Sequence, residues 1–467
     1  MPLRRPAAAL AGRTAGWLSR LTRRGGGTAV SGLVTSALDP TFVPDSLQQL
    51  HSTVTVTGTN GKTTTTAAIA ALARAAGQPV LTNPTGSNLE RGLAAALLPH
   101  VNLTGQIRDA PNLRAILELD EWAFAALAPT IRPRIALFLN LFRDQLDRYG
   151  EVDRTAAAWR DAIDDLDPDA TVVANADDPA VVAVTRRHRG PLLYFGADVD
   201  SDSTTPDAWA DVRRCPLCDG RLHWDRVVYA HLGTYRCQAC GFRRPQPDVC
   251  ITDFYPHGLA GASYRLTTAD SDARIEVQLP GLYNAYNLAA ALAGAHAAGV
   301  ASDRAYAVLE SFQPAFGRAE TISGPGVTIT LLLVKNPTGA NQTLDVLSSE
   351  PEPLDTLVLL NDGVADGEDV SWIWDVEFER LNPRRLFVGG LRAEDLALRL
   401  KYAGSAPQFD ATEVHPGITP ALDAAIHAEP AASGRRLIVL ATYTAMLDIR
   451  AECARRGWVD PYWQSAV

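Results

Sequence analysis

The sequence contains no apolar run that approaches the roughly 20 residues needed for a membrane-spanning helix. It also lacks the continuous apolar core of a secretory signal. The first absence argues against a helical integral membrane protein, and the second predicts a cytoplasmic protein whose cysteines stay reduced. With 46% hydrophobic and 21% charged residues, the composition is that of an ordinary globular protein with large cores.

Acidic residues are absent before Asp39, although the whole chain carries a formal net charge of −10. Six arginines lie in this segment among apolar side chains, namely Arg4, Arg5, Arg13, Arg20, Arg23 and Arg24 among Leu10, Trp17, Leu18 and Leu21. One interpretation is an amphipathic helix on an anionic membrane surface. The other is a basic helix that packs on its own domain. The acidic balance of the whole chain argues against a general nucleic-acid-binding protein.

Strand-like and helix-like segments alternate along most of the chain, which is typical of a parallel α/β sheet. Strands are expected at residues 53–57 and in the segments that begin at Leu113, Arg134 and Thr171. This alternation is interrupted over about residues 207–247, where cysteine pairs and short polar turns occur instead. We predict three parts, which are a short basic segment (1–50), a central domain that carries the insertion (51–320), and a second, Rossmann-like α/β domain (321–467).

The stretch TGTNGKTTT follows the first expected strand and precedes an alanine-rich helix. Only two residues separate Gly58 from Gly61, whereas the strict Walker pattern has four. Backbone N–H groups and a helix N-terminus still form a phosphate cradle in such a loop. Lys62 would reach the β- and γ-phosphates of ATP, and Thr63 or Thr64 would ligate Mg²⁺. The predicted ATP-binding residues of the loop are Gly58, Thr59, Asn60, Gly61, Lys62, Thr63 and Thr64.

Mg²⁺ needs a further oxygen ligand, usually a carboxylate at the end of a neighbouring strand. The segment LELDEW supplies Glu118, Asp120 and Glu121 at such a strand end. Glu118 is the first choice for a magnesium ligand. The alternative is that these acids only cap the helix that follows.

Four of the six cysteines form two C-x2-C pairs with 18 residues between them, namely Cys215, Cys218, Cys237 and Cys240. This spacing is typical of a tetrahedral Zn²⁺ ribbon, and four thiolates leave no position for a reactive water. We therefore predict a structural zinc site, in which His223 or His231 are possible substitute ligands. Nearby arginines keep nucleic-acid binding open as an alternative role for the ribbon.

Six motifs occur in the order GTNGKTTT, LELDEW, NLFRDQLDRYG, NADDP, GLYNAYNLAAA and FGRAE. Together they resemble the Mur ligase family, whose members use ATP to convert a carboxylate into an acyl phosphate that an amine then attacks. The resemblance implies a Mur-ligase-like P-loop ATPase domain with an inserted four-cysteine zinc ribbon, followed by a Rossmann-like α/β domain. It also implies that Asn284 and Asn287 lie near the nucleotide base and that Arg318 lies near the nucleotide at the domain junction.

Two positions depart from the Mur ligase pattern. Gln145 stands where the family usually has a histidine, and Trp159 stands where it usually has a carbamylated lysine that holds a second Mg²⁺. Only about 50 residues precede the phosphate loop, so the UDP-binding domain of the family is not expected. These departures argue against amino-acid-adding chemistry.

Other features resemble one subfamily, the MurT-type synthetase subunits of lipid II isoglutaminyl synthase. These features are GGGTA near Gly25, FRDQLDRYGE, the ribbon, VKNPTGAN and LNDGVADGEDVSWIWD. The resemblance implies a heterodimer with a GatD-like glutaminase that releases ammonia from glutamine. It also implies lipid II as substrate, amidation of its D-glutamate α-carboxyl, and a cytoplasmic location at the inner face of the membrane.

The acidic motif NDGVADGEDVSWIWD is, taken alone, a turn whose acids cap a short helix. No Cys–His pair in the chain stands in a nucleophile-elbow setting, so the chain itself has no glutaminase centre. The resemblance implies that an aspartate of this motif orients the partner's catalytic histidine. Asp369 is the first choice and Asp375 the second. Two other functions stay open: an amino-acid-adding ligase of the Mur or folylpolyglutamate type, and a zinc-ribbon ATP-binding regulatory module.

Overall fold

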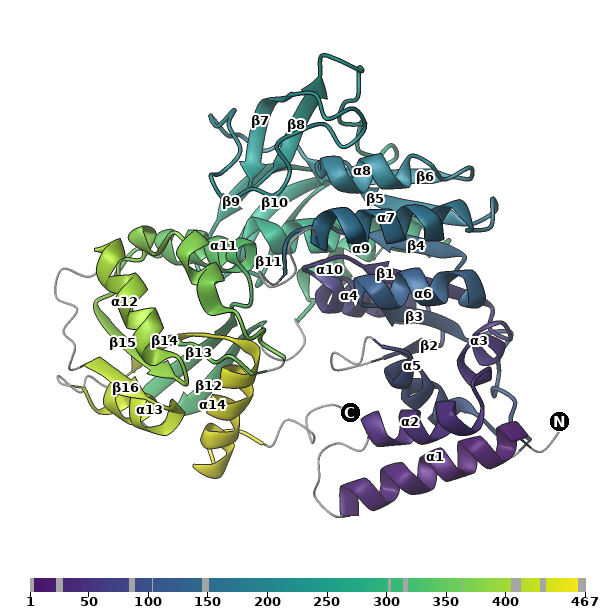
Figure 1. The fold of residues 1–467 in the computed structure, drawn as a ribbon, viewed down its shortest axis with the longest axis horizontal. Helices are drawn as coiled ribbons and strands as arrows, with labels where there is room; N and C mark the ends of the chain where they lie inside the picture. Colours follow the sequence, from purple (N-terminus) through teal and green to yellow (C-terminus); the bar gives the residue numbers. More distant parts are fainter. Residues whose placement is uncertain are drawn as a thin grey trace.

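The computed structural model describes ten stretches of the chain, residues 4–21, 28–83, 89–102, 104–144, 151–300, 304–313, 318–363, 365–404, 413–428 and 434–460. These stretches form two β-sheets with flanking helices and one small hairpin. The second sheet lies in its own lobe beside the first (Figure 1).

The first sheet has nine strands in the order β11-β10-β9-β6-β5-β4-β1-β3-β2. The neighbouring strands from β9 through β6, β5, β4, β1 and β3 to β2 pair in parallel. The pairs β9–β10 and β10–β11 are antiparallel. The strands are β1 (Ser52–Thr57), β2 (Val80–Thr82), β3 (Arg114–Glu118), β4 (Ile135–Phe138), β5 (Thr171–Asn175), β6 (Leu192–Ala197), β9 (Val249–Pro256), β10 (Ala262–Thr267) and β11 (Asp272–Val277). Every residue of β1, β3 and β4 is buried, as expected for strands covered on both faces.

Helices cover both faces of this sheet, because alternate strand residues point to opposite sides. Along β4, Ala136 and Phe138 belong to one core cluster and Ile135 and Leu137 to the other. The first cluster is covered by α5 (Glu90–Leu97), α6 (Glu121–Ile131), α7 (Glu151–Asp164) and α8 (Pro179–Thr185). The second is covered by α4 (Lys62–Ala75), α9 (Leu282–Ala297) and α10 (Ala305–Glu310).

The basic N-terminal segment forms helices that pack on the central domain. Helix α1 (Arg4–Leu21) lies on α2 (Thr28–Leu38), so closely that a Cβ at Gly12 would lie 2.0 Å from Oγ1 of Thr35. Arg13 donates to the carbonyl oxygens of Leu98 and Val101, at the short helix η1 (Leu98–His100) that follows α5. A third short helix is α3 (Phe42–Leu47). The segment therefore packs on its own domain, which is the second of the two interpretations above.

Part of α1 nevertheless faces solvent with apolar side chains. Leu10, Trp17 and Leu18 are 63%, 55% and 50% exposed. Within the described residues, no helix is both long and apolar enough to span a bilayer.

The second sheet has six strands in the order β12-β13-β17-β14-β15-β16. The β12–β13 pair is antiparallel and the other pairs are parallel. Its strands are β12 (Arg318–Gly324), β13 (Val327–Leu333), β14 (Asp355–Leu359), β15 (Arg385–Gly390), β16 (Val414–Pro416) and β17 (Arg435–Ala441). Its helices are α11 (Pro337–Ser348), η2 (Val370–Asp375), η3 (Phe378–Arg380), α12 (Ala393–Ala403), α13 (Ile418–His427) and α14 (Tyr443–Arg455).

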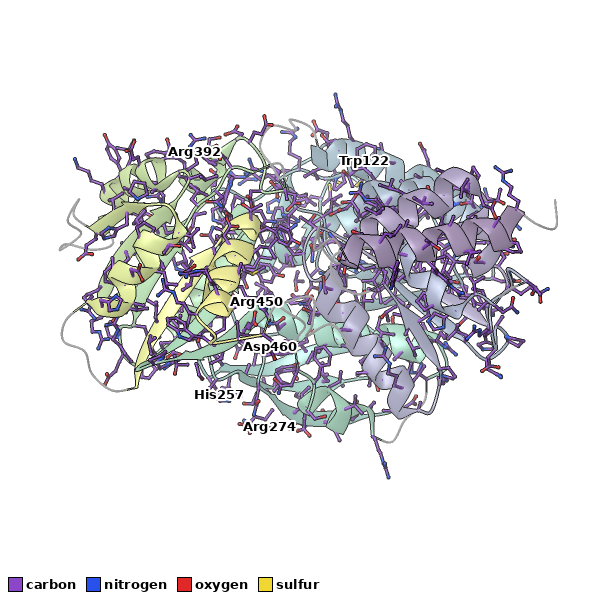
Figure 2. The ribbon with its side chains drawn as sticks, turned by 90° about the horizontal axis from the view of Figure 1, so that it is seen from below. Trp122, His257, Arg274, Arg392, Arg450 and Asp460 are labelled. Carbon is purple, nitrogen blue, oxygen red and sulfur yellow. The ribbon has the colours of Figure 1, made fainter. Side chains whose placement is uncertain are left out.

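A buried arginine ties the last helix of this lobe to its edge strand. Arg450 of α14 pairs with Glu320 of β12 at 2.9 Å. It also donates to the carbonyl oxygen of Asp460, and both Arg450 and Asp460 are labelled in Figure 2. The prediction of an α/β fold with a second Rossmann-like sheet is confirmed.

The insertion contains the hairpin of β7 (Leu222–Tyr229) and β8 (Leu232–Cys237), which stands beside β9 of the first sheet (Figure 1). Residues before the hairpin also reach the second lobe. The indole N–H of Trp209 lies 3.3 Å from Glu377, and Arg143 pairs with Asp211 and, at 3.4 Å, with Asp375.

Candidate active site

The phosphate loop joins the end of β1 to the start of α4, and both of its glycines are required by geometry. Gly61 has φ +89°, and a Cβ there would lie 2.0 Å from Oδ1 of Asn287. Gly58 has φ +139°, and a Cβ there would lie 2.8 Å from Cβ of Leu139. Only glycine combines these backbone conformations with such close neighbours.

The loop is held in shape by the segment that follows β4. The backbone N–H of Asn60 donates to Oδ1 of Asn140 at 2.8 Å, and Nδ2 of Asn140 donates back to the carbonyl of Asn60 at 3.0 Å. The Thr59 hydroxyl accepts from the N–H of Phe142 and donates to its carbonyl, both at 3.0 Å. Four hydrogen bonds therefore fix two consecutive loop residues before any ligand binds.

Lys62 lies at the first position of α4 and is almost completely buried, with 7% of it exposed. Its Nζ donates to the carbonyl oxygens of Gly58 and Thr59 and lies 3.5 Å from Oε1 of Glu121. Burial opposes the charged ammonium, but the surrounding carboxylates, Glu121 and Asp144 foremost, outweigh it and raise the pKa of Lys62. The loop therefore contains a fixed positive charge next to donor N–H groups, an arrangement suited to phosphate.

The three acids of LELDEW differ in environment. Asp120 caps α6 by accepting from the N–H of Trp122 at 3.1 Å, which is the alternative role considered above. Glu118 is buried at the end of β3, where its backbone exchanges hydrogen bonds with the Asn83 side chain. Glu121 is the acid that pairs with Lys62. The assignment of Glu118 as a magnesium ligand stays a prediction.

Burial raises the pKa of Glu121 to about 7, although Lys62 works in the opposite direction. Between its usual pKa and about 7, the folded protein therefore binds more protons than the unfolded chain, and this group costs stability as pH rises. We expect Glu121→Gln to gain free energy of unfolding relative to the parent protein as pH rises through that window, reaching about 3 kcal/mol at its upper end. Denaturant unfolding at several pH values checks this; a difference that does not change with pH would contradict it.

Trp159, at the position where Mur ligases usually carry a lysine, is a core residue. It is fully buried, its ring lies 5.0 Å from that of Phe138, and its indole N–H donates to the carbonyl of Glu121 at 3.1 Å. Gln145 lies outside the described residues.

The second sheet contributes two polar residues that the sequence reasoning did not assign. Lys335 and Asn336 follow β13, and both contact Asp144, at 2.8 Å from Nζ and 3.0 Å from Nδ2. Nδ2 of Asn336 also lies 3.2 Å from Oδ1 of Asn60 in the phosphate loop. Burial opposes ionisation of Asp144, but Lys335 and Lys62 together lower its pKa.

The motifs VKNP and FRD were the only sequence signals for these contacts. The chain has three lysines, and two of them, Lys62 and Lys335, lie at this site. Such a cluster of fixed cations, N–H groups and carboxylates suits a polyphosphate with its divalent cation.

Asn284 and Asn287 lie on α9 beside the phosphate loop. Nδ2 of Asn287 donates to Oδ1 of Asn284 at 3.2 Å, and Nδ2 of Asn284 donates to the carbonyl of Pro280. Their expected position near a nucleotide base remains a prediction. Arg318 begins β12, and its side chain lies outside the described residues.

The four predicted zinc ligands converge at one end of the hairpin. Their Sγ atoms all lie within 4.8 Å of one another, with Cys215 to Cys240 and Cys218 to Cys237 each 3.6 Å apart. Zn–S bonds of about 2.3 Å in a tetrahedron imply S···S edges of about 3.8 Å, so the cluster fits a zinc ion. Hydrogen bonds from the backbone N–H groups of Cys240 and Ala239 lower the pKa of the Cys237 thiol to about 7, which favours a thiolate.

Neither histidine of the insertion belongs to this cluster. His223 and His231 were possible substitute ligands, but the group of ligand atoms consists of the four cysteines.

The other two cysteines are buried. Burial raises the pKa of Cys250 to about 12 and that of Cys453 to about 11. Thiols with such pKa values are poor nucleophiles at neutral pH.

The acidic motif lies on the second lobe. Asp369 caps η2, its Oδ1 accepting from the N–H of Ser371 at 2.8 Å, and the hydrogen bonds from Ser371 lower its pKa. It is partly exposed and therefore accessible as an ionised carboxylate. Asp375 instead faces Arg143 of the central domain.

Two family models match the chain. The model of the Mur ligase middle domain matches residues 56–212, and the model of the MurT ligase C-terminal domain matches residues 333–446. They cover the phosphate loop and most of the second lobe respectively.

Similar proteins match over most of the chain. Subunit MurT of the glutamine-hydrolysing lipid II isoglutaminyl synthase of Streptococcus pneumoniae is 34% identical over 451 residues, which are 96% of each chain. The subunit of the same name from Staphylococcus aureus strain COL is 29% identical over 81% of this chain and 83% of its own.

Solved structures show the fold at lower identity. A pseudomurein peptide ligase type C from Methanothermus fervidus has a TM-score of 0.63 and 17% identity, over 87% of this chain and 78% of its own. MurF from Acinetobacter baumannii has a TM-score of 0.62 and 17% identity, over 90% and 80%.

Proposed function

The chain belongs to the MurT family of Mur-ligase-like proteins, and on that premise we propose that it is the synthetase subunit of a lipid II isoglutaminyl synthase. In the proposed reaction, an oxygen of the D-glutamate α-carboxylate attacks the γ-phosphorus of ATP and displaces ADP. Ammonia then attacks the carbonyl carbon of the acyl phosphate, inorganic phosphate leaves, and the nitrogen loses a proton. The product is the amide, D-isoglutamine.

One observation supports the proposal most strongly: a lysine-bearing phosphate loop contacts the second sheet in a chain that is similar to a MurT subunit over 96% of its length. Lys62 and the loop N–H groups would stabilise the charge that develops on the transferred phosphoryl group. Lys335, from the second lobe, would add a second cation opposite the loop. Asp144 orients Lys335 through their ion pair.

The proposal includes two metal ions, and the four cysteines fit one of them. Thr63 and Glu118 would hold Mg²⁺, which would neutralise negative charge on the phosphates. The four cysteines would hold Zn²⁺ as a closed tetrahedral site, which stabilises the insertion and leaves no ligand position for catalysis.

The site suits ammonia as the nucleophile better than an amino acid. Trp159 fills the space behind Glu121 with an apolar ring. No lysine occurs in α7, so the second metal-binding group of amino-acid-adding Mur ligases has no counterpart there.

Glutamine hydrolysis is assigned to a partner. The relatives are named as glutamine-hydrolysing, whereas the two cysteines of this chain outside the metal cluster are buried thiols with raised pKa values. The proposed partner is a GatD-like glutaminase that supplies a thiolate and an imidazole. Asp369 would complete its triad by orienting the imidazole across the interface.

The surface near Asp369 has the composition of a docking face for this glutaminase. Trp374 and Tyr402 are exposed with their rings 5.9 Å apart, and Leu398 is exposed on the same helix as Tyr402. Exposed aromatic side chains are enriched in interface centres. Glu368 and Asp369 place acidic groups near this apolar patch, which fits a partner with a basic rim.

We further propose that α1 contacts the membrane in which lipid II resides. Leu10, Trp17 and Leu18 are the exposed apolar side chains of this acid-free helix. Such side chains insert at the interface of a bilayer with anionic lipids.

ADP release tests the reaction class. In the complex of the chain with its glutaminase, ADP formation from ATP should require lipid II together with ammonium or glutamine. Adding free amino acids in place of ammonium should give no increase. ADP formation driven by an amino acid would favour the amino-acid-adding alternative, and ADP formation indifferent to lipid II would favour a regulatory ATP-binding module.

A further inference from the structure

We infer that the cysteine-bearing insertion (residues 207–247) positions the phosphate loop, so that metal occupancy of the four cysteines sets nucleotide affinity. The inference rests on the proposed function only in taking the loop as a nucleotide site. Two chains of contacts connect the hairpin to the loop, and they leave the insertion at different residues.

The first chain starts at His231, in the turn between β7 and β8. Its side chain is fully buried, and its ring centroid lies 4.9 Å from that of Phe142. Its Nε2 lies 3.5 Å from Oδ1 of Asp178, and neither ring nitrogen makes a hydrogen bond within the described part of the chain. Burying an imidazole without hydrogen bonds is costly, so the packing around it must hold the hairpin tip in place.

Both neighbours of His231 connect directly to the loop-supporting segment. The N–H and carbonyl groups of Phe142 bond the Thr59 hydroxyl at 3.0 Å. Asp178 accepts from the N–H of Leu141 at 2.8 Å through its other oxygen. One residue therefore separates the hairpin tip from Thr59 of the phosphate loop.

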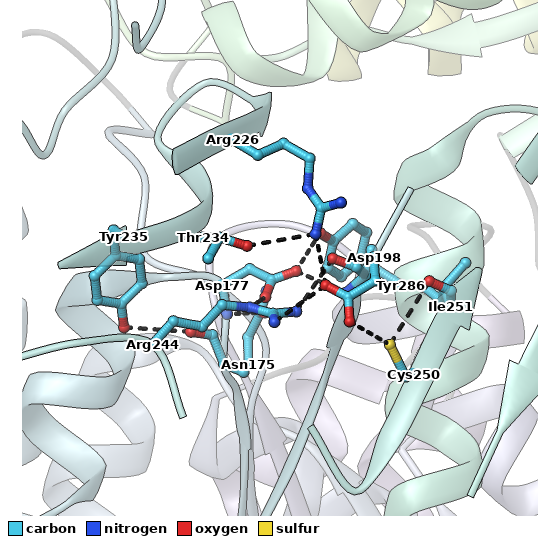
Figure 3. A network of polar contacts seen from close by, with 12 residues as sticks. Asn175, Asp177, Asp198, Arg226, Thr234, Tyr235, Arg244, Cys250, Ile251 and Tyr286 are labelled. Carbon is cyan, nitrogen blue, oxygen red and sulfur yellow. Dashed lines mark hydrogen bonds and ion pairs between the residues drawn. The ribbon is translucent and has the colours of Figure 1, made fainter. Parts of the chain in front are cut away.

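The second chain starts at Arg244, just beyond the last cysteine of the cluster, and reaches α9 (Figure 3). The Arg244 guanidinium pairs with the fully buried Asp177, whose other oxygen accepts from the Tyr286 hydroxyl. Tyr286 precedes Asn287, whose Oδ1 fills the space against Gly61. This second chain of contacts therefore ends at Gly61, the residue that precedes α4.

The hairpin itself holds Arg244 in place. The backbone N–H of Arg244 donates to the carbonyl of Tyr235 in β8 at 3.1 Å. Arg226 of β7 and Arg244 also share one carboxylate, because both guanidinium groups pair with Asp198, at 2.6 and 3.2 Å (Figure 3). A displacement of either hairpin strand would therefore move the start of the second chain.

The metal would hold the cysteine-bearing end of the hairpin, while core packing holds its tip. Among the described strands β7 and β8 pair only with each other, so side-chain packing and the metal, rather than a strand ladder, hold the hairpin on the first sheet. Four thiolates gathered within 4.8 Å repel one another unless a cation binds them. Metal binding to such a cluster is coupled to local folding, so loss of the metal should loosen the ends of both contact chains.

The test measures ADP affinity in the purified complex, with Mg²⁺ present throughout. One sample keeps its metal, and a second is stripped with a chelator that is then removed before Mg²⁺ is restored. We expect the stripped protein to bind ADP about tenfold more weakly, which corresponds to about 1.4 kcal/mol. Restoring Zn²⁺ should restore the affinity.

Variants of the metal-loaded protein separate positioning from general stability. His231→Ala should raise the Kd for ADP and the KM for ATP, while kcat at saturating ATP stays near that of the parent. His223→Ala, in the same hairpin but outside both contact chains, is the matched control and should change neither. If His231→Ala fails to fold, Tyr286→Phe decides, because it removes only the hydroxyl that bonds Asp177 and should weaken ADP binding several-fold.

Equal ADP affinity in the loaded and stripped proteins would overturn the inference. Unchanged affinity in both His231→Ala and Tyr286→Phe would do the same. Failure of the loaded parent protein to bind ADP at all would instead contradict the proposed function, so the two failures are distinguishable.

Discussion

Replacing Lys62 by alanine should lower ammonium-driven amidation of lipid II by about 10² to 10³-fold. The buried ammonium is held by carbonyl oxygens of its own loop and by Glu121, and its pKa is raised, so it presents a permanent charge to the phosphates. No other lysine or arginine of the phosphate loop can replace it, because residues 58–66 contain no second cation. The measurement is the initial rate of amide formation at saturating ammonium.

Lys401→Ala is the matched control for this experiment. Lys401 is exposed on α12 and is not among the charged groups that act on Lys62, Glu121 or Asp144, so its removal should leave the rate unchanged. A Lys62→Ala variant that folds normally and amidates lipid II at the parent rate would show that the loop does not serve phosphoryl transfer.

Replacing Asp369 by alanine should abolish the glutamine-driven reaction while sparing the ammonium-driven one. Loss of an aspartate that orients a catalytic histidine lowers turnover by up to about 10⁴-fold. The ammonium-driven reaction bypasses the glutaminase and depends on the synthetase site alone. Both rates are measured on the same preparation of the complex.

Two further variants make this result specific. Glu368→Ala removes the exposed acid next to Asp369 and should leave both rates unchanged. Asp375→Ala removes a contact to Arg143 at the junction of the lobes, so it should lower both rates by the same factor. A variant at Asp369 that still hydrolyses glutamine and remains bound to the glutaminase would contradict its assignment.

The phosphate loop and the cysteine cluster were predictable because their chemistry is local. Gly58, Gly61 and Lys62 lie within five consecutive residues, and each cysteine pair lies in a single tight turn. Local spacing determines the geometry in both cases, so the residue types alone indicate a phosphate cradle and a metal cluster. The α/β architecture was predictable for a similar reason, since buried parallel strands have continuous apolar sequences.

The contacts between distant parts of the chain were not predictable in the same way. Asp144 meets Lys335 only because β13 of the second sheet ends opposite the phosphate loop. Burial likewise decides which acid pairs with Lys62, and the pair is formed by Glu121. His231 shows the same limit: its sequence position suggested a substitute zinc ligand, whereas its side chain packs against Phe142 in the core.

The measurement that tests the central claim most directly is mass spectrometry of lipid II after incubation of the complex with ATP, Mg²⁺ and isotope-labelled ammonium. The proposed function predicts that one labelled nitrogen replaces the hydroxyl of the D-glutamate α-carboxyl, and that Lys62→Ala prevents it. Lipid II that keeps its free carboxyl under every condition, while an added amino acid becomes joined to it, would contradict the account.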